Sequence, residues 1–338
     1  MSLLIAKIVN TKLADVGFFN RNQQFEMSAK LGQQLTAMLM PLVGVLCFLF
    51  IWSLSASQIE TSLGKFPGPG AVVTQVGNLY NEHVSERGKE EAFYQRQEKR
   101  NAERLAKDPS YVVKVRAYTG KETFVDQIAT SLITVLAGFL LAAVLAIPLG
   151  IAIGLSKALN SAINPMIQIF KPVSPLAWLP LVTMVVSAVY VSNDPLFAKS
   201  FINSMITVTL CCLWPMIIQT SVGVASLNSD WINVSRVLRL PALTHVRKIV
   251  LPATIPAIFT GMRTSLGIAW MVLIAAEMLA QNPGLGKFVW DEFQNGSSQS
   301  LSRIMTAVFV IGLIGYMLDR GMLLLQRWLS WDKASASR

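Results

Sequence analysis

Two charged side chains, Arg263 and Glu277, interrupt an otherwise apolar run at residues 256–280. A charge within a membrane-spanning helix usually faces the bundle interior or a pathway, because hydrocarbon cannot solvate it. Helical geometry places the two groups near one face but about 21 Å apart, so they cannot pair. A guanidinium matches planar oxyanions. Arg263 is therefore either an anion attractor or a structural group that binds helix-start carbonyls or reaches the membrane interface. Glu277 would repel an anion, which favours a structural or gating role.

Aromatic side chains in the apolar runs are further candidates for lining a pathway: Trp178, Trp214 and Trp270. Tryptophan in membrane helices more often packs or anchors at an interface than it cages a ligand. Packing is therefore the favoured interpretation. Trp178 and Trp270 still complete, with Arg263 and Glu277, the candidate set for a translocation pathway.

A short basic segment at residues 233–252, NVSRVLRLPALTHVRKIVLP, separates two long apolar runs. Asp230 or Asn233 can cap a short helix there, Pro241 would end it, and a second helical run would continue to Val250. The segment thus predicts a stiff element lying across the membrane surface. It is either a contact for another protein or a plain interfacial loop. Its charges and prolines are Arg236, Arg239, Arg247, Lys248, Pro241 and Pro252.

Other reactive groups are sparse. Cys47, Cys211 and Cys212 fall within apolar runs, and His83 and His245 stand alone, so neither a disulfide framework nor a metal cluster is expected. The sequence has no G-x-x-x-x-G-K-[ST] motif for ATP. We therefore expect this chain to bind no cofactor and to catalyse no reaction.

The composition requires a lipid environment. The chain has 338 residues, of which 53% are hydrophobic and 14% charged, whereas soluble domains are about 25% charged. A helix crosses the hydrocarbon core with about 20 apolar residues, and lipid-exposed spans must satisfy their own backbone polar groups. The sequence therefore predicts an all-α integral membrane protein with about six transmembrane helices. The runs are 35–54, 128–155, 172–193, 200–229, 256–280 and 302–325.

The net charge of +10 indicates orientation rather than nucleic-acid binding, because cytoplasmic loops of membrane proteins are rich in Lys and Arg. Cations cluster before the first run, in the basic segment and after the last run. Both termini are therefore expected in the cytoplasm. The predicted division is 1–34, an N-terminal tail with an amphipathic helix; 35–54, the first span; 55–123, a periplasmic insertion with a charged helix; 124–328, a core of five spans; and 329–338, a tail.

The basic segment resembles the cytoplasmic pattern of ABC importer permeases, which is E-A-A, three residues, G, nine residues and I-x-L-P. Ile249, Leu251 and Pro252 fit the end of this pattern. Its front half departs, with Arg239 at the glycine position and other residues at E-A-A: Asn233, Val234 and Ser235. The stretches NVSRVLRL, KIVLPATIPAIFTGMRTSLGIAW and AAEML resemble nitrate and bicarbonate importer permeases. PLAWLPL is shared with taurine and aliphatic sulfonate permeases. The resemblance covers about residues 124–328.

The resemblance implies a binding-protein-dependent (MetI-like) permease fold in the bacterial inner membrane. A second, identical permease chain, two ATPase subunits that bind ATP and Mg, and a periplasmic or lipid-anchored substrate-binding protein would complete the importer. A coupling helix at about 230–250 would contact the ATPase through a set of residues: Asn233, Ser235, Arg236, Arg239, Leu240, Ile249, Leu251 and Pro252.

Nitrate is the first substrate that the resemblance implies, and bicarbonate, cyanate and sulfonates or taurine remain open. A function of another class, a stand-alone secondary transporter or channel, would show paired internal repeats, and none is evident in the sequence.

Overall fold

The computed structural model of the chain describes residues 39–61, 64–191 and 196–329, and these form two compact units divided at Gly70. The first unit contains the apolar helix Leu39–Gln58. It also contains a short hairpin in which β1 (Glu60–Thr61) pairs antiparallel with β2 (Gly64–Lys65). The predicted tail at 1–34, the start of the first span and the C-terminal residues from 330 lie outside the described residues.

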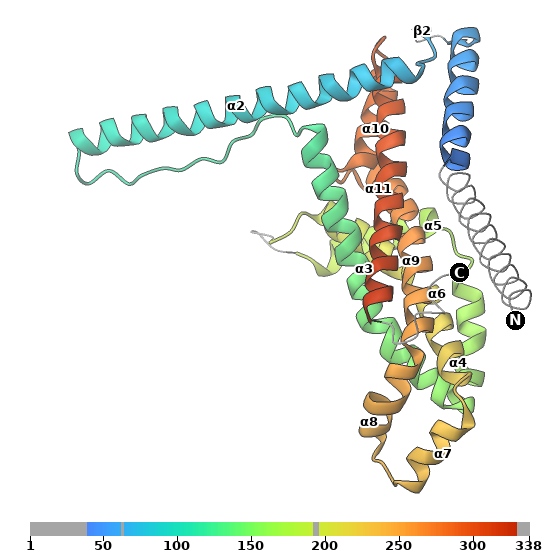
Figure 1. Ribbon diagram of the computed structural model, residues 1–338. Coiled ribbons are helices and arrows are strands. Elements are labelled where there is room, and N and C mark those ends of the chain that lie inside the picture. Colours follow the sequence, from blue (N-terminus) through green and yellow to red (C-terminus); the bar gives the residue numbers. More distant parts are fainter. Residues whose placement is uncertain (1–38, 62–63, 192–195, 330–338) are drawn as a thin grey trace, which may run out of the picture. The chain divides into compact units, whose positions relative to one another are not determined.

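The second unit is helical, and its charged helix α2 belongs to the same compact unit as the apolar helices after residue 123. Figure 1 shows these helices. Its elements are α2 (Pro69–Lys107, with its first two residues in the first unit), α3 (Phe124–Leu155), α4 (Lys157–Phe170), α5 (Pro175–Val189), α6 (Lys199–Ala225), α7 (Ser229–Val237), α8 (Ala242–His245), the π-helix η1 (Val246–Val250), α9 (Leu251–Ala280), α10 (Leu285–Asn295) and α11 (Ser300–Leu329).

Five described helices are long and apolar enough to cross a membrane: Leu39–Gln58, α3, α6, α11 and the continuous helix Ala242–Ala280, which includes α8, η1 and α9. The predicted third span at 172–193 contains only α5. With the preceding α4 it forms a pair bent by 101°, and this pair is a sixth candidate span if the two helices are taken as one. Ser174 caps α5 by accepting from the N–H of Leu176, and Pro175 follows in the first turn. Proline disfavours a helical residue before it, so the chain turns here. The 15-residue α5 is about 22 Å long, too short to cross alone.

The core of the second unit is a packed row in which α6 lies between α3 and α9. Glycine allows close approach at both interfaces. A Cβ at Gly138 would lie 2.8 Å from the carbonyl oxygen of Met205, and one at Gly261 would lie 2.8 Å from the Cβ of Gln219. Ser265 Oγ also donates to the carbonyl of Cys212 on the facing helix at 3.0 Å. Small residues and interhelical hydrogen bonds are the means by which helices associate in lipid.

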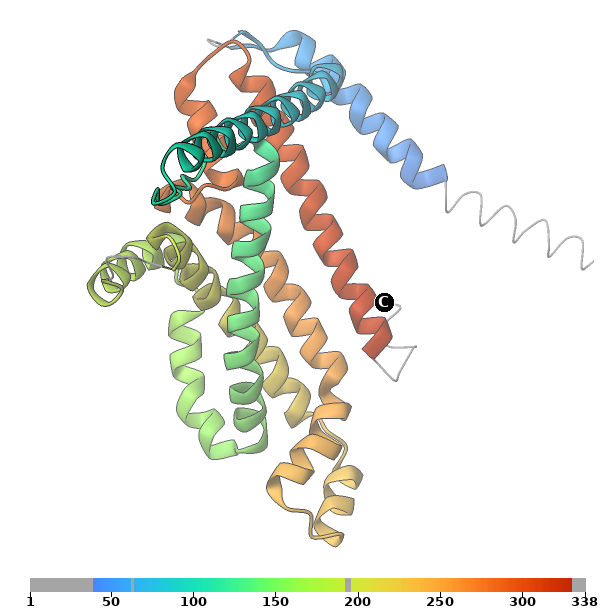
Figure 2. The ribbon, with the colours of Figure 1, turned by 90° about the vertical axis from the view of Figure 1, so that its left-hand side faces the viewer.

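The two ends of this row carry different structures. Helix α2 lies across one end, near α10, and its second half extends beyond the row (Figure 1). The α7–α8 region lies at the opposite end (Figure 2). The expected cytoplasmic position of the basic segment would place α2 on the outer side.

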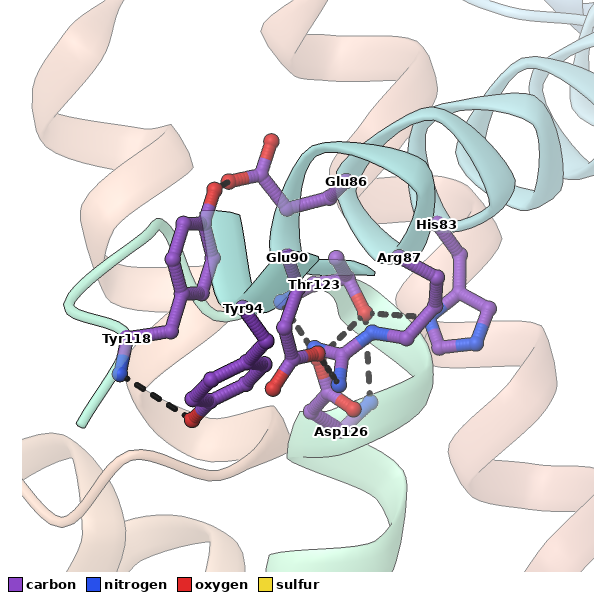
Figure 3. A network of polar contacts seen from close by, with 8 residues as sticks. All are labelled: His83, Glu86, Arg87, Glu90, Tyr94, Tyr118, Thr123 and Asp126. Carbon is purple, nitrogen blue, oxygen red and sulfur yellow. Dashed lines mark hydrogen bonds and ion pairs between the residues drawn. The ribbon is translucent and has the colours of Figure 1, made fainter. Parts of the chain in front are cut away.

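Polar side chains fix the inner half of α2 to the start of α3 (Figure 3). Thr123 and Asp126 form a capping box that begins α3. His83 Nδ1 lies 2.7 Å from Thr123 Oγ1, and Arg87 Nη2 donates to Asp126 Oδ2 at 3.0 Å while its Nη1 donates to Glu90 at 2.6 Å. The helix start of α3 is thus part of the attachment site for α2.

Arg303 forms a second attachment, from α11. It donates to both carboxylate oxygens of Glu82 on α2 at 2.6 and 3.1 Å, and its Nε lies 2.6 Å from Glu292 on α10. The guanidinium also lies over the ring of Phe288 at 5.5 Å. The hydrogen bond from Arg303 lowers the pKa of Glu82 below its ordinary value. One side chain that is 11% exposed therefore joins three helices.

Replacement of Arg303 tests this attachment. Arg303→Ala leaves two carboxylates without their cation, which costs on the order of 2 kcal/mol, so α2 should detach from the bundle end more often. Trypsin added outside spheroplasts should cut α2 faster than in the parent protein. Lys89→Ala is the matched control, because Lys89 pairs within α2, with Glu86. Equal cleavage rates in both variants would contradict the role of Arg303.

Candidate functional site

The basic segment forms a helix, a sharp turn and a second helix at the end opposite α2. Asn228, rather than Asp230 or Asn233, caps α7, accepting from the N–H of Asp230 at 3.0 Å. The helix ends at Val237, before Pro241, which instead stands at the cap of α8. The predicted position of the first helix was therefore shifted by several residues, because the backbone turn at Arg239 ends it before the proline does.

Arg239 adopts a left-handed backbone conformation with φ 46°. The N–H of Leu240 donates to the carbonyl of Ser235, and the N–H of Arg239 donates to the carbonyl of Arg236. These two bonds define a Schellman motif, whose left-handed residue is usually glycine because it has no Cβ. The glycine of the importer-permease pattern thus corresponds to a helix-ending turn, and this chain makes that turn with an arginine.

An apolar surface lies on α7, before this turn. Trp231 is 50% exposed and Val237 is 82% exposed, and Val234 and Leu238 are also exposed on the same short helix. A groove of about 390 Å³ lies between α7 and the start of α9, lined by Trp231, Val234, Lys248, Ile249, Pro252 and Ala253. Trp231 was not among the predicted contact residues. Its i, i+3, i+7 spacing with Val234 and Leu238 is the signal that would have found it.

The predicted coupling residues divide by exposure. Ser235 is buried and its carbonyl accepts the Schellman bond, so it supports the turn and does not reach the surface. Leu240 and Ile249 are half-buried. The exposed members are Asn233, Arg236, Arg239, Leu251 and Pro252. This end of the bundle therefore presents cations around an apolar groove, an arrangement suited to contact with another protein.

Arg263 does not stand alone within its span. Its Nε and Nη2 donate to Oδ1 and Oδ2 of Asp319 on α11 at 2.5 and 2.9 Å. The sequence alone did not reveal this pair. The signal was present, because Arg263 and Asp319 each interrupt an apolar run and a charge at membrane depth needs a partner.

The pair lies deep along both helices and at a side of the bundle. Arg263 is 12 residues from the start of α9 and Asp319 is 10 residues from the end of α11, so each is about 15–18 Å from its helix end. Their side chains are 36% and 38% exposed in the single chain. Charges at such depth face a cavity or protein rather than lipid. This exposed side therefore suits contact with a water-filled pathway or another subunit.

Glu277 has a different environment, because its side chain is fully buried within the chain. Ser131 Oγ lies 2.8 Å from Oε2, and the N–H of Gly286 donates to the same oxygen at 3.0 Å. Ser131 in turn accepts from the N–H of Leu285. A Cβ at Gly284 would lie 2.2 Å from Oε1. Glu277 thus holds the α9–α10 turn against α3, a structural role, and it does not line a pathway in this conformation.

The two candidate tryptophans pack within the chain. Trp270 is buried, and its Nε1 donates to the carbonyl of Ile311 on α11 at 2.9 Å. Trp178 lies beside Phe170, with ring centroids 5.9 Å apart, and Phe170 stacks on Trp214 at 5.7 Å. The structure therefore brings neither tryptophan to Arg263. Trp270 instead joins the same two helices, α9 and α11, as the Arg263–Asp319 pair.

The fold and these two sites define a multi-pass membrane protein with an exposed apolar groove at one end and a paired charge within its spans. Comparison with known proteins identifies its family. Residues 146–331 match the family described as binding-protein-dependent transport system inner membrane component. The matched region covers more than half of the chain, from within α3 to beyond α11. The chain belongs to this family. It is a permease subunit of an ABC transporter, in which separate ATPase subunits hydrolyse ATP.

Named relatives include permeases for two anions. The chain is 37% identical over 194 residues to the nitrate import permease protein NrtB of Synechococcus elongatus, covering 57% of this chain and 66% of the relative. It is 33% identical over 298 residues to the bicarbonate transport system permease protein CmpB of the same organism, covering 88% of this chain and 91% of the relative. The second match exceeds the 215 residues from 124 to 338, so it extends into the N-terminal third.

A solved structure supports the fold alone. A chain of the MetNI methionine ABC transporter, in inward-facing conformations, aligns with a TM-score of 0.53 at 14% identity and covers 61% of this chain and 96% of that chain. The predicted all-α, MetI-like architecture is confirmed.

The buried hydrogen bonds around Glu277 predict that this residue stabilises the protein. Glu277→Ala leaves the Gly286 N–H and the Ser131 hydroxyl with a lost acceptor, which costs about 1–3 kcal/mol for each buried group. The melting temperature of the purified Glu277→Ala protein in detergent should fall. The decrease should be smaller for Glu277→Gln, because glutamine keeps an acceptor oxygen. An unchanged melting temperature in Glu277→Ala would contradict the structural role.

The left-handed turn at Arg239 predicts that one substitution increases the stability of the protein. Arg239→Gly removes the Cβ from a left-handed residue and should stabilise the protein by about 1 kcal/mol, whereas Arg239→Val should destabilise it. Thermal unfolding in detergent would measure both changes in stability.

A charge reversal at the same position tests contact with the ATPase. Arg239→Glu keeps a side chain but reverses its charge, and it should weaken co-purification of the ATPase. Co-purification at the parent level would show that the cation makes no contact there.

Proposed function

We propose that this chain is the membrane-spanning subunit of an ATP-driven importer for a small planar oxyanion in a bacterial inner membrane. The observation that carries the proposal is the forked pair of Arg263 and Asp319, half-exposed at membrane depth. A carboxylate and a planar oxyanion offer a guanidinium the same pair of oxygens. Asp319 therefore occupies the position that a transported anion would take.

The charge balance of this pair suggests how an anion passes. With Asp319 bound, Arg263 is neutralised, which keeps its desolvation cost low at membrane depth. Separation of α9 from α11 would free the guanidinium for an incoming anion, and their return would expel it. Arg263 would then bind Asp319 and the anion in alternation, so that the guanidinium always has an anionic partner.

Nitrate is the anion that we propose. Its support is the resemblance in the fifth span and the 37% identity with a nitrate import permease. Bicarbonate shares the planar oxyanion geometry, and the bicarbonate relative covers more of the chain. Cyanate and sulfonates or taurine are also candidate substrates. Vesicles containing the complete transporter, supplied separately with labelled nitrate and labelled bicarbonate, would distinguish nitrate from bicarbonate. ATP-dependent uptake of bicarbonate without uptake of nitrate would show that the substrate is bicarbonate and not nitrate.

The assembly that we propose follows from the two bundle ends. The cationic groove around Trp231 and Ile249 would receive an ATPase subunit, as the importer-permease pattern implies. Two ATPases that bind ATP and Mg and a second, identical permease chain would complete the membrane complex. A periplasmic or lipid-anchored binding protein would deliver the anion on the α2 side.

Substitutions at the ion pair test the pathway. Arg263→Ala should lower ATP-dependent anion uptake about tenfold or more, because it removes a charge-assisted, two-point contact worth roughly 1.5–3 kcal/mol. Asp319→Asn weakens the internal competitor and should lower the KM for the anion. The matched control is Arg320→Gln. Arg320 is a cation of α11, the helix of Asp319, and its guanidinium lies over the ring of Tyr316, 5.1 Å from the ring centroid.

Assembly must be measured in the same samples, by co-purification of the ATPase, so that loss of the complex is not mistaken for loss of binding. Uptake at the parent level in a fully assembled Arg263→Ala transporter would refute the anion role of Arg263.

A further inference from the structure

The outer half of α2 and the segment that returns from it form one ordered structure, which we call the basic arm (residues 95–118). Gln97 donates to the carbonyl of Arg116 at 3.2 Å and accepts from the N–H of the same residue at 2.8 Å. Asn101 donates to the carbonyl of Lys114 at 3.1 Å. The returning segment is therefore bound along α2.

The arm extends past the attachments of α2. Arg87, which binds the start of α3, and Lys107, at the end of α2, are 20 residues apart, so the helix continues for about 30 Å beyond this attachment. In Figure 1 the returning segment lies on the side of α2 that faces the bundle, and it leads directly to α3. Because α3 is a candidate membrane span that begins there, the returning segment would lie close to the level of the lipid headgroups.

Charge is distributed unevenly along α2 and its return. Residues 69–94 contain four acids and two bases, a net charge of −2, whereas the basic arm contains seven bases and three acids, a net charge of +4. A cleft of about 200 Å³ in the arm is lined by Gln97, Arg100, Asn101, Arg104, Tyr111, Lys114 and Arg116. These described lining residues include four cations and no carboxylate, so the cleft favours an anionic group.

The returning segment is also apolar at its surface. Val112 and Val115 are each 76% exposed, and Val113 is exposed beside them. Tyr111 lies under the guanidinium of Arg104, 5.6 Å from its ring centroid. Exposed valines interleaved with Lys114 and Arg116 and flanked by tyrosines have the composition of a segment that rests in a membrane interface.

We propose that the basic arm binds the phosphate headgroups of anionic lipids in the outer leaflet. The arginines and lysine of the cleft would hold a phosphate, and the valines would enter the boundary with the acyl chains. A soluble acidic protein arriving from outside fits the geometry less well, since the returning segment lies on the bundle side of α2 and such a protein would meet the other side first. The proposal requires the membrane orientation of the permease but not the identity of its anion.

The arm would give α2 two supports, one on the protein and one on lipid. The inner half is bound to α3 and α11 by Arg87 and Arg303, and the outer half would be bound to the leaflet. With both supports, α2 would keep a fixed distance from the membrane surface. Anionic lipid would therefore influence the position of α2 at the outer end of the bundle.

A spin label on the arm tests the proposal in the complete transporter. Val115→Cys is labelled in a Cys47→Ala background, because Cys211 and Cys212 are half-buried and buried. The complex is reconstituted into phosphatidylcholine vesicles with or without about 30% phosphatidylglycerol. In the anionic vesicles the ratio of oxygen to nickel-complex accessibility should rise roughly twofold or more, as expected for entry into the interface.

Charge variants supply the comparison. The combined variant Arg100→Gln, Arg104→Gln, Lys114→Gln and Arg116→Gln should abolish the rise, and about 1 M salt should reduce it because charges are then screened within about 3 Å. The matched control, Lys89→Gln with Lys121→Gln, removes two cations outside the arm and should retain the rise.

Three results would overturn the proposal. The label could report bulk water in anionic vesicles, which would exclude interfacial binding. It could be immobilised by nitrate or inorganic phosphate in detergent, which would indicate a free-anion site. It could be protected only when the binding protein is added, which would indicate a protein-docking surface. Because none of these readings measures transport, failure of the arm proposal is distinguishable from failure of the proposed anion import.

Discussion

The close packing of α6 between α3 and α9 is the constraint on which the rest of the second unit depends. In lipid, apolar side chains gain little by leaving the solvent, so helices associate through close backbone approach and interhelical hydrogen bonds. Gly138 and Gly261 allow that approach, and Ser265 adds a bond to the backbone of the facing helix. This row sets the positions of α10 and α11, and through them the places where charged groups can be paired.

The charged groups near these helices illustrate three solutions to one problem. Glu277 is buried and receives donors from the neighbouring turn and from Ser131. Arg303 is nearly buried and bridges carboxylates of two other helices at the outer end. Arg263 and Asp319 neutralise each other but remain half-exposed. Only the last of these three arrangements leaves a fork whose partner could be exchanged, which is why the anion proposal rests there rather than on Glu277.

Each end of the bundle presents an element that is firmly joined to the membrane helices. At one end, a Schellman turn at Arg239 and a continuous helix from Ala242 to Ala280 join the contact surface to a membrane span. At the other, α2 is fixed by side chains from α3 and α11. A displacement of α9 would therefore reach the groove at one end, and a displacement of α11 would reach α2 at the other.

The sequence by itself determined the membrane class, the helical content and the approximate position of most spans, because long uncharged runs permit little else in lipid. It also located the basic segment and its family pattern, which the comparisons confirm at the level of the family. Tertiary structure decided what each charge does. Composition could not pair Arg263 with Asp319, 56 residues away, bury Glu277 under a turn, or show that the third span is a short helix α5 sharply bent from the preceding α4. These outcomes depend on which helices become neighbours, and hydrophobic runs of similar composition do not specify their neighbours.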